Sequence, residues 1–158
     1  MSRRQSGRLP MIFAAHALIM SGFALCFALP ANAAPYSNYD NYSPSKRQIE
    51  AQISPTLRRC IATSGGVTEA MDECLATEHS RIYKRFMISY DDILKRVSPK
   101  SAKDELAASH ALWITSRKNA YNIEMERLGG GSAGSLAAFN RDLRELIRRY
   151  LWLQQYRR

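Results

Sequence analysis

"LRRCIATSGGVTEAMDECLATEHSRIYKRFMISYDDIL", residues 57–94, contains the features that decide the fold. Cys60 and Cys74 stand on either side of a break formed by Gly65 and Gly66. Helical periodicity precedes and follows the two glycines, so the stretch predicts a helix end, a turn and the start of a second helix. Two cysteines in this arrangement can form part of a metal site, a redox centre or a structural disulfide. The compartment of the protein decides between these, and the N-terminus indicates the compartment.

Residues 1–8 carry three arginines and no acid, and an apolar run over residues 11–30 follows them. With small residues at Ala31 and Ala33, this order is typical of a secretory signal peptide, and we expect cleavage after Ala33. The alternative is a retained membrane anchor, because the run approaches the roughly 20 residues that span a bilayer. Its Ser, Gly, Pro and His residues favour cleavage. The protein is therefore expected to be periplasmic or secreted, through either the general or the twin-arginine route.

Export removes Cys26 and leaves Cys60 and Cys74 in an oxidising compartment, where a disulfide is the default state. A zinc site needs further ligands at short spacing, and His79 and His110 are each isolated. A redox-active pair is normally two residues apart. We therefore predict a Cys60–Cys74 disulfide, with no metal site and no cofactor.

Cleavage leaves 125 of the 158 residues and changes the formal net charge from +9 to +6, because the removed segment holds three arginines and no acid. This length predicts one domain with one core. Residues 34–47 are rich in Tyr, Asn and Ser without apolar periodicity, and they predict a flexible lead-in to a domain over residues 48–158. The positive charge favours anionic lipid, glycan or acidic protein as partners, whereas export argues against nucleic acid.

The rest of the chain shows helical periodicity and no strand pattern. We expect a first helix over about residues 46–63, which a proline can interrupt, and a second over residues 68–97. A third helix opens with Ser98 as its N-cap and ends at three consecutive glycines, and Ser132 or Ser135 caps a fourth. The prediction is an all-α fold, a small up-and-down bundle of about four helices with one disulfide. We expect no transmembrane segment after cleavage.

The last two helices each show one apolar stripe. The third places on it Leu106, His110, Trp113, Ile114, Arg117 and Tyr121, and the fourth places on it Leu136, Phe139, Leu143, Leu146, Ile147, Tyr150 and Leu153. The arginines of the fourth helix are expected to point largely outward. Together with the aromatic residues of "RRYLWLQQYRR", residues 148–158, they are candidates for contact with an anionic surface. These candidates are Arg141, Arg144, Arg148, Arg149, Arg157 and Arg158.

Catalysis needs a nucleophile, a base or a metal beside a group that tunes it. No such convergent set is present in the sequence, because the histidines are isolated and the acidic pair Asp91–Asp92 is paired only by adjacency. We therefore expect no enzymatic activity. Trp113 and Arg117 stand four residues apart on one helix face. We interpret the indole as core and the guanidinium as bound to carbonyls or a carboxylate, with a polar recognition patch as the alternative.

The order of motifs over residues 57–149 resembles the LprI-type lysozyme-inhibitor family, a group of small exported helical domains. The family's T-x-x-M-x-x-C core corresponds to Thr68, Met71 and Cys74, and its W-x-x-x-R motif to Trp113 and Arg117. Its glycine–serine turn corresponds to Gly130, Gly131 and Ser132. The resemblance implies a helical fold that binds a lysozyme or a related cell-wall hydrolase, with these residues mainly structural.

Two features depart from the family pattern. The second cysteine pair that members commonly carry is replaced by Ala120–Tyr121 and Phe139–Asn140. The positive charge of the mature chain also opposes association with a strongly basic C-type lysozyme. These departures leave two functions open. The first is an exported binding protein that uses a protruding loop, such as "SGGVTE" (64–69) or "GGGSAG" (129–134). The second is a basic envelope-surface module that binds anionic lipid or glycan.

Overall fold

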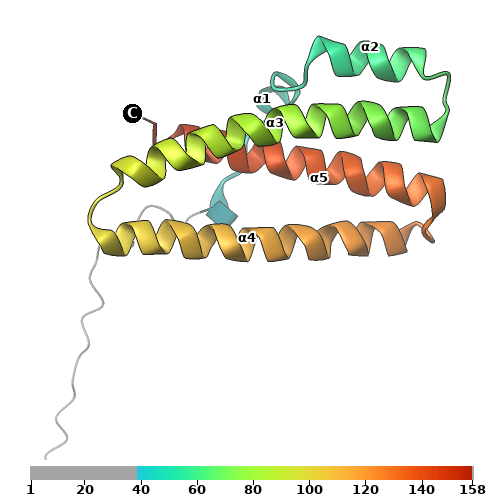
Figure 1. Cartoon of the computed structure of the whole chain (residues 1–158). Coiled ribbons are helices and arrows are strands. Elements are labelled where there is room, and N and C mark those ends of the chain that lie inside the picture. The colour runs from blue at the N-terminus through green and yellow to red at the C-terminus, as the bar shows by residue number, and fades with distance from the viewer. Residues whose placement is uncertain (1–38, 158) are drawn as a thin grey trace, which may run out of the picture. The chain divides into compact units, whose positions relative to one another are not determined.

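The computed structural model describes residues 39–157, and it confirms the predicted all-α class (Figure 1). The five helices of this range are α1 (Lys46–Glu50), α2 (Pro55–Thr63), α3 (Thr68–Arg96), α4 (Lys100–Arg127) and α5 (Gly131–Gln154). The described range contains no strand. The predicted signal peptide, residues 1–33, and Arg158 lie outside the described residues.

Helix α5 lies between α3 and α4 and packs against both (Figure 1). The long helices alternate in direction, as an up-and-down bundle requires, and α2 packs along α3. Because two helices cover α5, its Leu146, Ile147 and Leu153 are completely buried. By contrast, α4 buries only Leu106 and Trp113, so most of its surface is exposed.

The first predicted helix is two helices, which corrects the expectation of one over residues 46–63. Pro55 stands at the first position of α2, where its missing N–H costs nothing, and Ser54 caps this helix. Glu78 of α3 accepts hydrogen bonds from the Ser54 N–H at 2.8 Å and from its hydroxyl at 2.7 Å. The break between α1 and α2 is therefore held by a buried carboxylate from α3.

The Cys60–Cys74 disulfide is present, as predicted, and joins α2 to α3 with a Cα–Cα distance of 5.8 Å. Between the two cysteines the chain reverses at Gly65 and Gly66, whose φ angles are +62° and +79°. Positive φ values favour glycine, which explains why the turn falls at this pair. Helices α2 and α3 thus form a helical hairpin, with the two glycines at its turn and the disulfide between its two helices.

The predicted serine caps of the last two helices are wrong. Helix α4 begins after Pro99, and Ser98 makes no capping hydrogen bond. Helix α5 begins at Gly131 with Gly130 in the N-cap position and no side-chain cap. The Ser135 hydroxyl instead donates to Asp72 Oδ2 of α3 at 3.0 Å. Helix α5 starts at this point because three successive glycines adopt positive φ angles. Both serines therefore lie inside α5, beyond its N-cap position.

The predicted core is confirmed at most positions, with three corrections. Ile114 is 49% exposed, because adjacent helical residues point about 100° apart and Trp113 takes the inward direction. Trp152 is completely buried, although the C-terminal aromatic residues are candidates for contact with an anionic surface. Arg149, expected outward, is 1% exposed. The last two corrections have one cause, since α5 is covered on more than one face.

The chain before α1 also differs from the expected flexible lead-in where it is described. A 3₁₀ turn over residues 39–41 packs on α5, and Tyr39 is 8% exposed. Arg148 donates to the backbone carbonyls of Tyr42 at 2.7 Å, of Asp40 at 3.3 Å and of Tyr39 at 3.4 Å. The folded unit therefore begins by Tyr39. Among the helices within residues 39–157, none has the length and apolarity to cross a bilayer.

Candidate functional site

Two glycine turns lie at the same end of the bundle (Figure 1). One joins α2 to α3 and the other joins α4 to α5, and the Ser135–Asp72 hydrogen bond connects the starts of α5 and α3. We call this the glycine-turn end and define it as residues 64–73 and 123–136. It contains both loops, 64–69 and 129–134, that we predict from the sequence as candidate binding loops.

The backbone of these turns is open. A Cβ placed on Gly66 or on Gly130 would meet no heavy atom within 4 Å. Gly130 has φ +70° and ψ −153°, a region that is essentially restricted to glycine. The glycines are therefore required by the backbone conformation and not by crowding, and another molecule can approach the turns closely.

Exposed apolar side chains flank both turns. Val67, at the N-terminus of α3, is 58% exposed, and Leu128, at the C-terminus of α4, is 40% exposed. The glycine-turn end contains five acidic residues and one basic residue. Its local charge is thus opposite in sign to that of the whole chain. Exposed apolar side chains with acidic neighbours are suited to contact with a basic protein partner.

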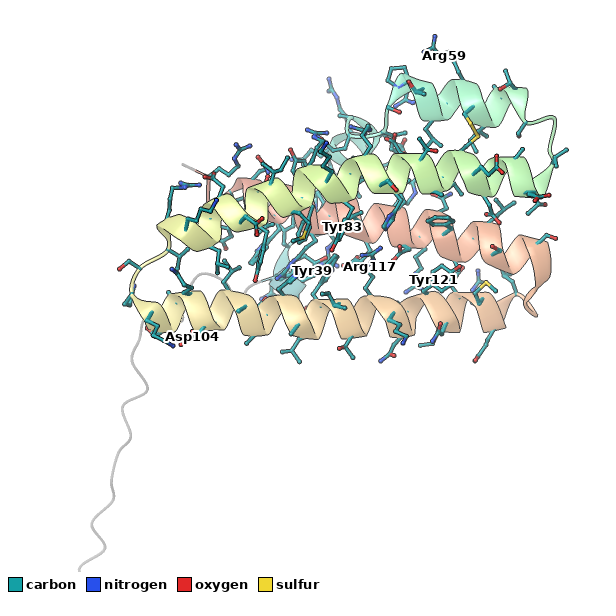
Figure 2. The ribbon with its side chains drawn as sticks, viewed as in Figure 1. Tyr39, Arg59, Tyr83, Asp104, Arg117 and Tyr121 are labelled. Atoms are coloured by element: carbon teal, nitrogen blue, oxygen red, sulfur yellow. A yellow bond between two sulfur atoms is a disulfide. The ribbon has the colours of Figure 1, made fainter. Side chains whose placement is uncertain are left out.

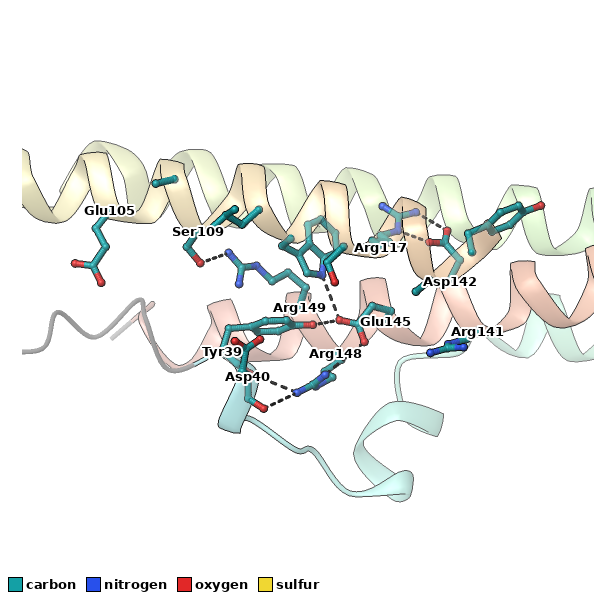
Figure 3. Close-up of a pocket in the computed structure, with 16 residues that line it drawn as sticks. Tyr39, Asp40, Glu105, Ser109, Arg117, Arg141, Asp142, Glu145, Arg148 and Arg149 are labelled. Carbon is teal, nitrogen blue, oxygen red and sulfur yellow. Dashed lines mark hydrogen bonds and ion pairs between the residues drawn. The ribbon is translucent and has the colours of Figure 1, made fainter. Parts of the chain in front are cut away.

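A groove of about 720 Å³ runs between α4 and α5 (Figure 3). Trp113 and Leu112 of α4 form part of one wall, and Glu145 and Arg149 of α5 form part of the other. The Tyr39 hydroxyl donates to Glu145, and Trp113 Nε1 donates to the same carboxylate oxygen at 3.3 Å. Burial, and then the Glu145 charge, raise the pKa of Tyr39, so its hydroxyl keeps its proton.

Arg149 lines this groove and is almost completely buried. Its guanidinium lies 4.1 Å from the ring centre of Trp152, 4.5 Å from that of Tyr39 and 5.7 Å from that of Trp113. One nitrogen donates to the Ser109 hydroxyl at 3.0 Å (Figure 3). Burial lowers the pKa of Arg149 to about 10, and the side chain remains charged at neutral pH.

Arg117 has the carboxylate partner that we predict for it. Arg117 projects from α4 toward the other long helices (Figure 2). It forms an ion pair with Asp142 of α5 (Figure 3) and also contacts the His79 ring of α3. His79 Nε2 lies 3.3 Å from Asp142 Oδ2. Burial works to raise the pKa of Asp142, but the hydrogen bonds from His79 and Arg117 outweigh it and lower that pKa. This cluster joins three helices, so the W-x-x-x-R motif has a structural role here.

The arginines proposed for anionic contact do not form one free patch. Arg141 pairs with Glu124 at 3.0 Å, Arg144 with Glu50 at 2.8 Å, and Arg148 holds the chain before α1. Arg149 is buried. Arg157 lies 4.0 Å from Asp92, and Arg158 is outside the described residues.

The remaining motif residues lie at the starts of α3 and α5. Thr68 begins α3, and Met71 is half-buried one turn later. Gly130 is the N-cap residue of α5, and Gly131 and Ser132 are its first two residues.

The groove is not predicted from the sequence, because it depends on Tyr39, Glu145 and Arg149, which are not adjacent in the chain. The signal that points to it is the i,i+4 spacing of Glu145 and Arg149, which places both on the α5 face that meets Trp113. Within the described residues, no three His, Cys, Asp or Glu side chains gather to hold a metal ion. Comparison with protein-family models, curated proteins and solved structures gives no match for this chain.

Proposed function

We propose that the protein is an exported periplasmic binding protein that acts by protein–protein contact without catalysis, in the manner of the lysozyme inhibitors it resembles. Its target is a lysozyme or another cell-wall hydrolase, and the glycine-turn end is the contact surface. One observation carries the proposal: two open turns lie at the same end of the bundle, and each has an exposed apolar side chain beside it, Val67 or Leu128.

The charge distribution supports this choice of surface. The mature chain carries +6, which opposes approach to a basic hydrolase. The glycine-turn end has a local charge of −4, from five acids and one arginine. The opposite end of α3 and α4, residues 95–103, holds four basic residues and no acid. A basic partner is therefore attracted to the glycine-turn end and turned away from the other.

The test is an inhibition assay with a C-type lysozyme and the variant Val67→Asn/Leu128→Gln. Asn is a good N-cap, so the change at position 67 keeps α3 supported while it removes the apolar contact. We expect the inhibition constant to rise about tenfold or more, as for loss of central interface residues.

Ile88→Gln is the matched control. Ile88 is 58% exposed, as Val67 is, and it lies on the same helix roughly 30 Å away along its axis. Its substitution should leave the inhibition constant unchanged. Equal loss of inhibition in both variants would argue against the glycine-turn end, and absence of inhibition by the unmodified protein would argue against a lysozyme target.

A second candidate function is a basic envelope-surface module, which the basic run over residues 95–103 favours. Lys95, Arg96 and Lys100 are exposed there. Cosedimentation with anionic vesicles tests it. Binding that requires these residues must weaken as salt shortens the Debye length from about 10 Å at 0.1 M to about 3 Å at 1 M. Salt-independent sedimentation would exclude this function.

A further inference from the structure

Arg149 is a buried cation with incomplete hydrogen bonding. It is 1% exposed, and its Nε and Nη1 groups have no hydrogen-bond partner among the described residues. The Ser109 hydroxyl and three aromatic rings are its polar and cation–π contacts. A buried charge is costly unless it is paired, and the bare N–H groups add to that cost. The side chain therefore retains unused capacity for an anion.

The other groove arginines do not share this property. Arg117 is paired with Asp142, Arg141 with Glu124, and Arg148 with Glu145 at 3.6 Å. No ion pair with a carboxylate of the described residues involves Arg149, although it lines the same groove. Arg149 is thus the groove arginine that has no ion pair with a carboxylate of the described residues. A ligand with a single negative charge would supply that partner.

The wall that α4 contributes is apolar over part of its length, and Glu105, Ser109 and Ser116 of the same helix also line the groove. Ala108, Leu112 and Ala120 of α4 line the groove, and Leu112 is 73% exposed. A volume of about 720 Å³ is within the range of small-molecule sites. An exposed leucine next to a buried guanidinium is complementary to a molecule with an apolar body and an anionic head.

Tyr39 covers this position in the structure. Its ring stacks 4.5 Å from the Arg149 guanidinium, and its hydroxyl donates to Glu145 (Figure 3). The segment that carries it precedes α1 and is bound to α5 by Arg148 through backbone carbonyls. Tyr39 lies outside the three long helices, so displacement of its ring does not require those helices to unfold.

We propose that the groove between α4 and α5 binds an amphiphilic monoanion, whose carboxylate pairs with Arg149 in place of the Tyr39 ring and whose apolar chain lies along Leu112. The inference goes beyond the proposed protein contact, because the groove and the glycine-turn end are separate surfaces. Glu145 stays engaged by Trp113 and Arg148, so the displaced tyrosine hydroxyl leaves no bare carboxylate.

Tryptophan fluorescence of the purified protein measures this binding directly. The chain has two tryptophans, Trp113 and Trp152, and both contact Arg149. We expect a saturable change in emission with octanoate as the probe. Two controls should each bind about tenfold more weakly or not at all. Octanol has the apolar chain without the charge, and acetate has the charge without the apolar chain. Equal responses to octanoate and octanol would overturn the role of Arg149, and equal responses to octanoate and acetate would overturn the role of the apolar wall.

Two variants and one control localise the site. Arg149→Gln should weaken octanoate binding about tenfold or more, because the charge-assisted hydrogen bonds are lost. Arg144→Gln, on the same helix but outside this wall, should have no effect. Tyr39→Ala removes the ring that competes for Arg149. Octanoate binding should then tighten several-fold, because no free energy is needed to displace the ring. If Arg149→Gln does not fold, Tyr39→Ala decides alone: unchanged or weaker octanoate binding in that variant would overturn the proposal.

Discussion

Buried polar residues connect the helices of this bundle, and their hydrogen bonds decide their charge states. Glu78, 3% exposed, accepts from Ser54 and Arg81 and joins α3 to the start of α2. Burial works to raise its pKa, but those hydrogen bonds outweigh burial and lower it. His110 lies among Phe86, Tyr90 and Trp113 instead, without a partner for Nδ1 in the described residues. These two environments predict different responses to pH.

Trp113→Ala should lower the free energy of unfolding by about 3–5 kcal/mol, as loss of a buried large aromatic residue does. Trp113 is 4% exposed and contacts the Phe86 and His110 rings. Leu112→Ala is the neighbouring control, because Leu112 is 73% exposed and its loss should stay within about 0.5 kcal/mol. Urea unfolding measures both, and equal losses would contradict the assignment of Trp113 to the core.

Stability should fall between pH 7 and pH 5 because of His110. Burial, followed by the Arg149 charge, lowers the pKa of His110 from 6.5 to about 4. In that window the unfolded chain binds the proton and the folded chain does not, so stability is lost as the pH falls through the unfolded pKa. The expected loss is about 2 kcal/mol. Replacement of His110 by Phe should flatten this part of the profile, measured by urea unfolding at each pH. A profile of equal slope in the variant would exclude His110 as the cause.

Helical periodicity in the sequence predicts some of the buried residues and misses others. Periodicity identifies Trp113, Leu143 and Ile147 as core because each lies on a regular stripe. The same periodicity predicts that Arg149 is exposed, because charged residues of an amphipathic helix are assigned to its polar face. The aromatic rings that make its burial possible come from elements far apart in the chain, so no local pattern contains them.

At the scale of elements, the glycine turns and the disulfide fix where helices begin and end. The α2–α3 hairpin is predicted in full, because paired glycines and flanking cysteines are local signals. The start of α5 is not predicted, because Ser132 and Ser135 satisfy the usual cap preference while Gly130 takes the N-cap position. The split between α1 and α2 depends on Glu78, which is 24 residues away from Ser54.

Gly130→Ala should cost about 1–3 kcal/mol, because its φ and ψ angles disfavour a side chain. Ser132→Ala should change stability by no more than about 0.5 kcal/mol, because Ser132 makes no capping hydrogen bond. Thermal unfolding of the two variants side by side measures the difference. A loss of about 1 kcal/mol for Ser132→Ala would restore the serine to the capping role.

Removal of the disulfide in the Cys60→Ala/Cys74→Ala variant should cost about 2–5 kcal/mol, the range for a native disulfide in a small exported domain. The purified, non-reduced protein should be two hydrogens lighter than its reduced form by mass spectrometry. Free thiols in the folded protein would contradict the bond between α2 and α3.

At the scale of the whole molecule, charge is distributed unevenly along the helices. The α3–α4 connection is basic, and the glycine-turn end is acidic. The overall charge, read from composition, predicts repulsion from a basic partner, whereas the fold separates the two signs to opposite ends of α3. This separation follows from the antiparallel arrangement, and it makes a basic chain compatible with the basic target that we propose.

Charge reversal tests that separation. Glu69→Lys/Glu73→Lys, both exposed on the first turns of α3, should weaken binding to a C-type lysozyme about tenfold at low salt and less at high salt. Asp91→Lys, exposed near the other end of α3, is the control and should leave binding within about twofold. Equal effects of the two changes would indicate that net charge, and not its location, controls association.

The most direct test of the contact surface is amide hydrogen exchange of the protein with and without bound lysozyme. Our account predicts added protection in residues 64–73 and 123–136 and unchanged exchange in residues 95–103. Protection confined to residues 95–103, or to the α4 and α5 walls of the groove, would contradict the assignment of the glycine-turn end as the binding surface.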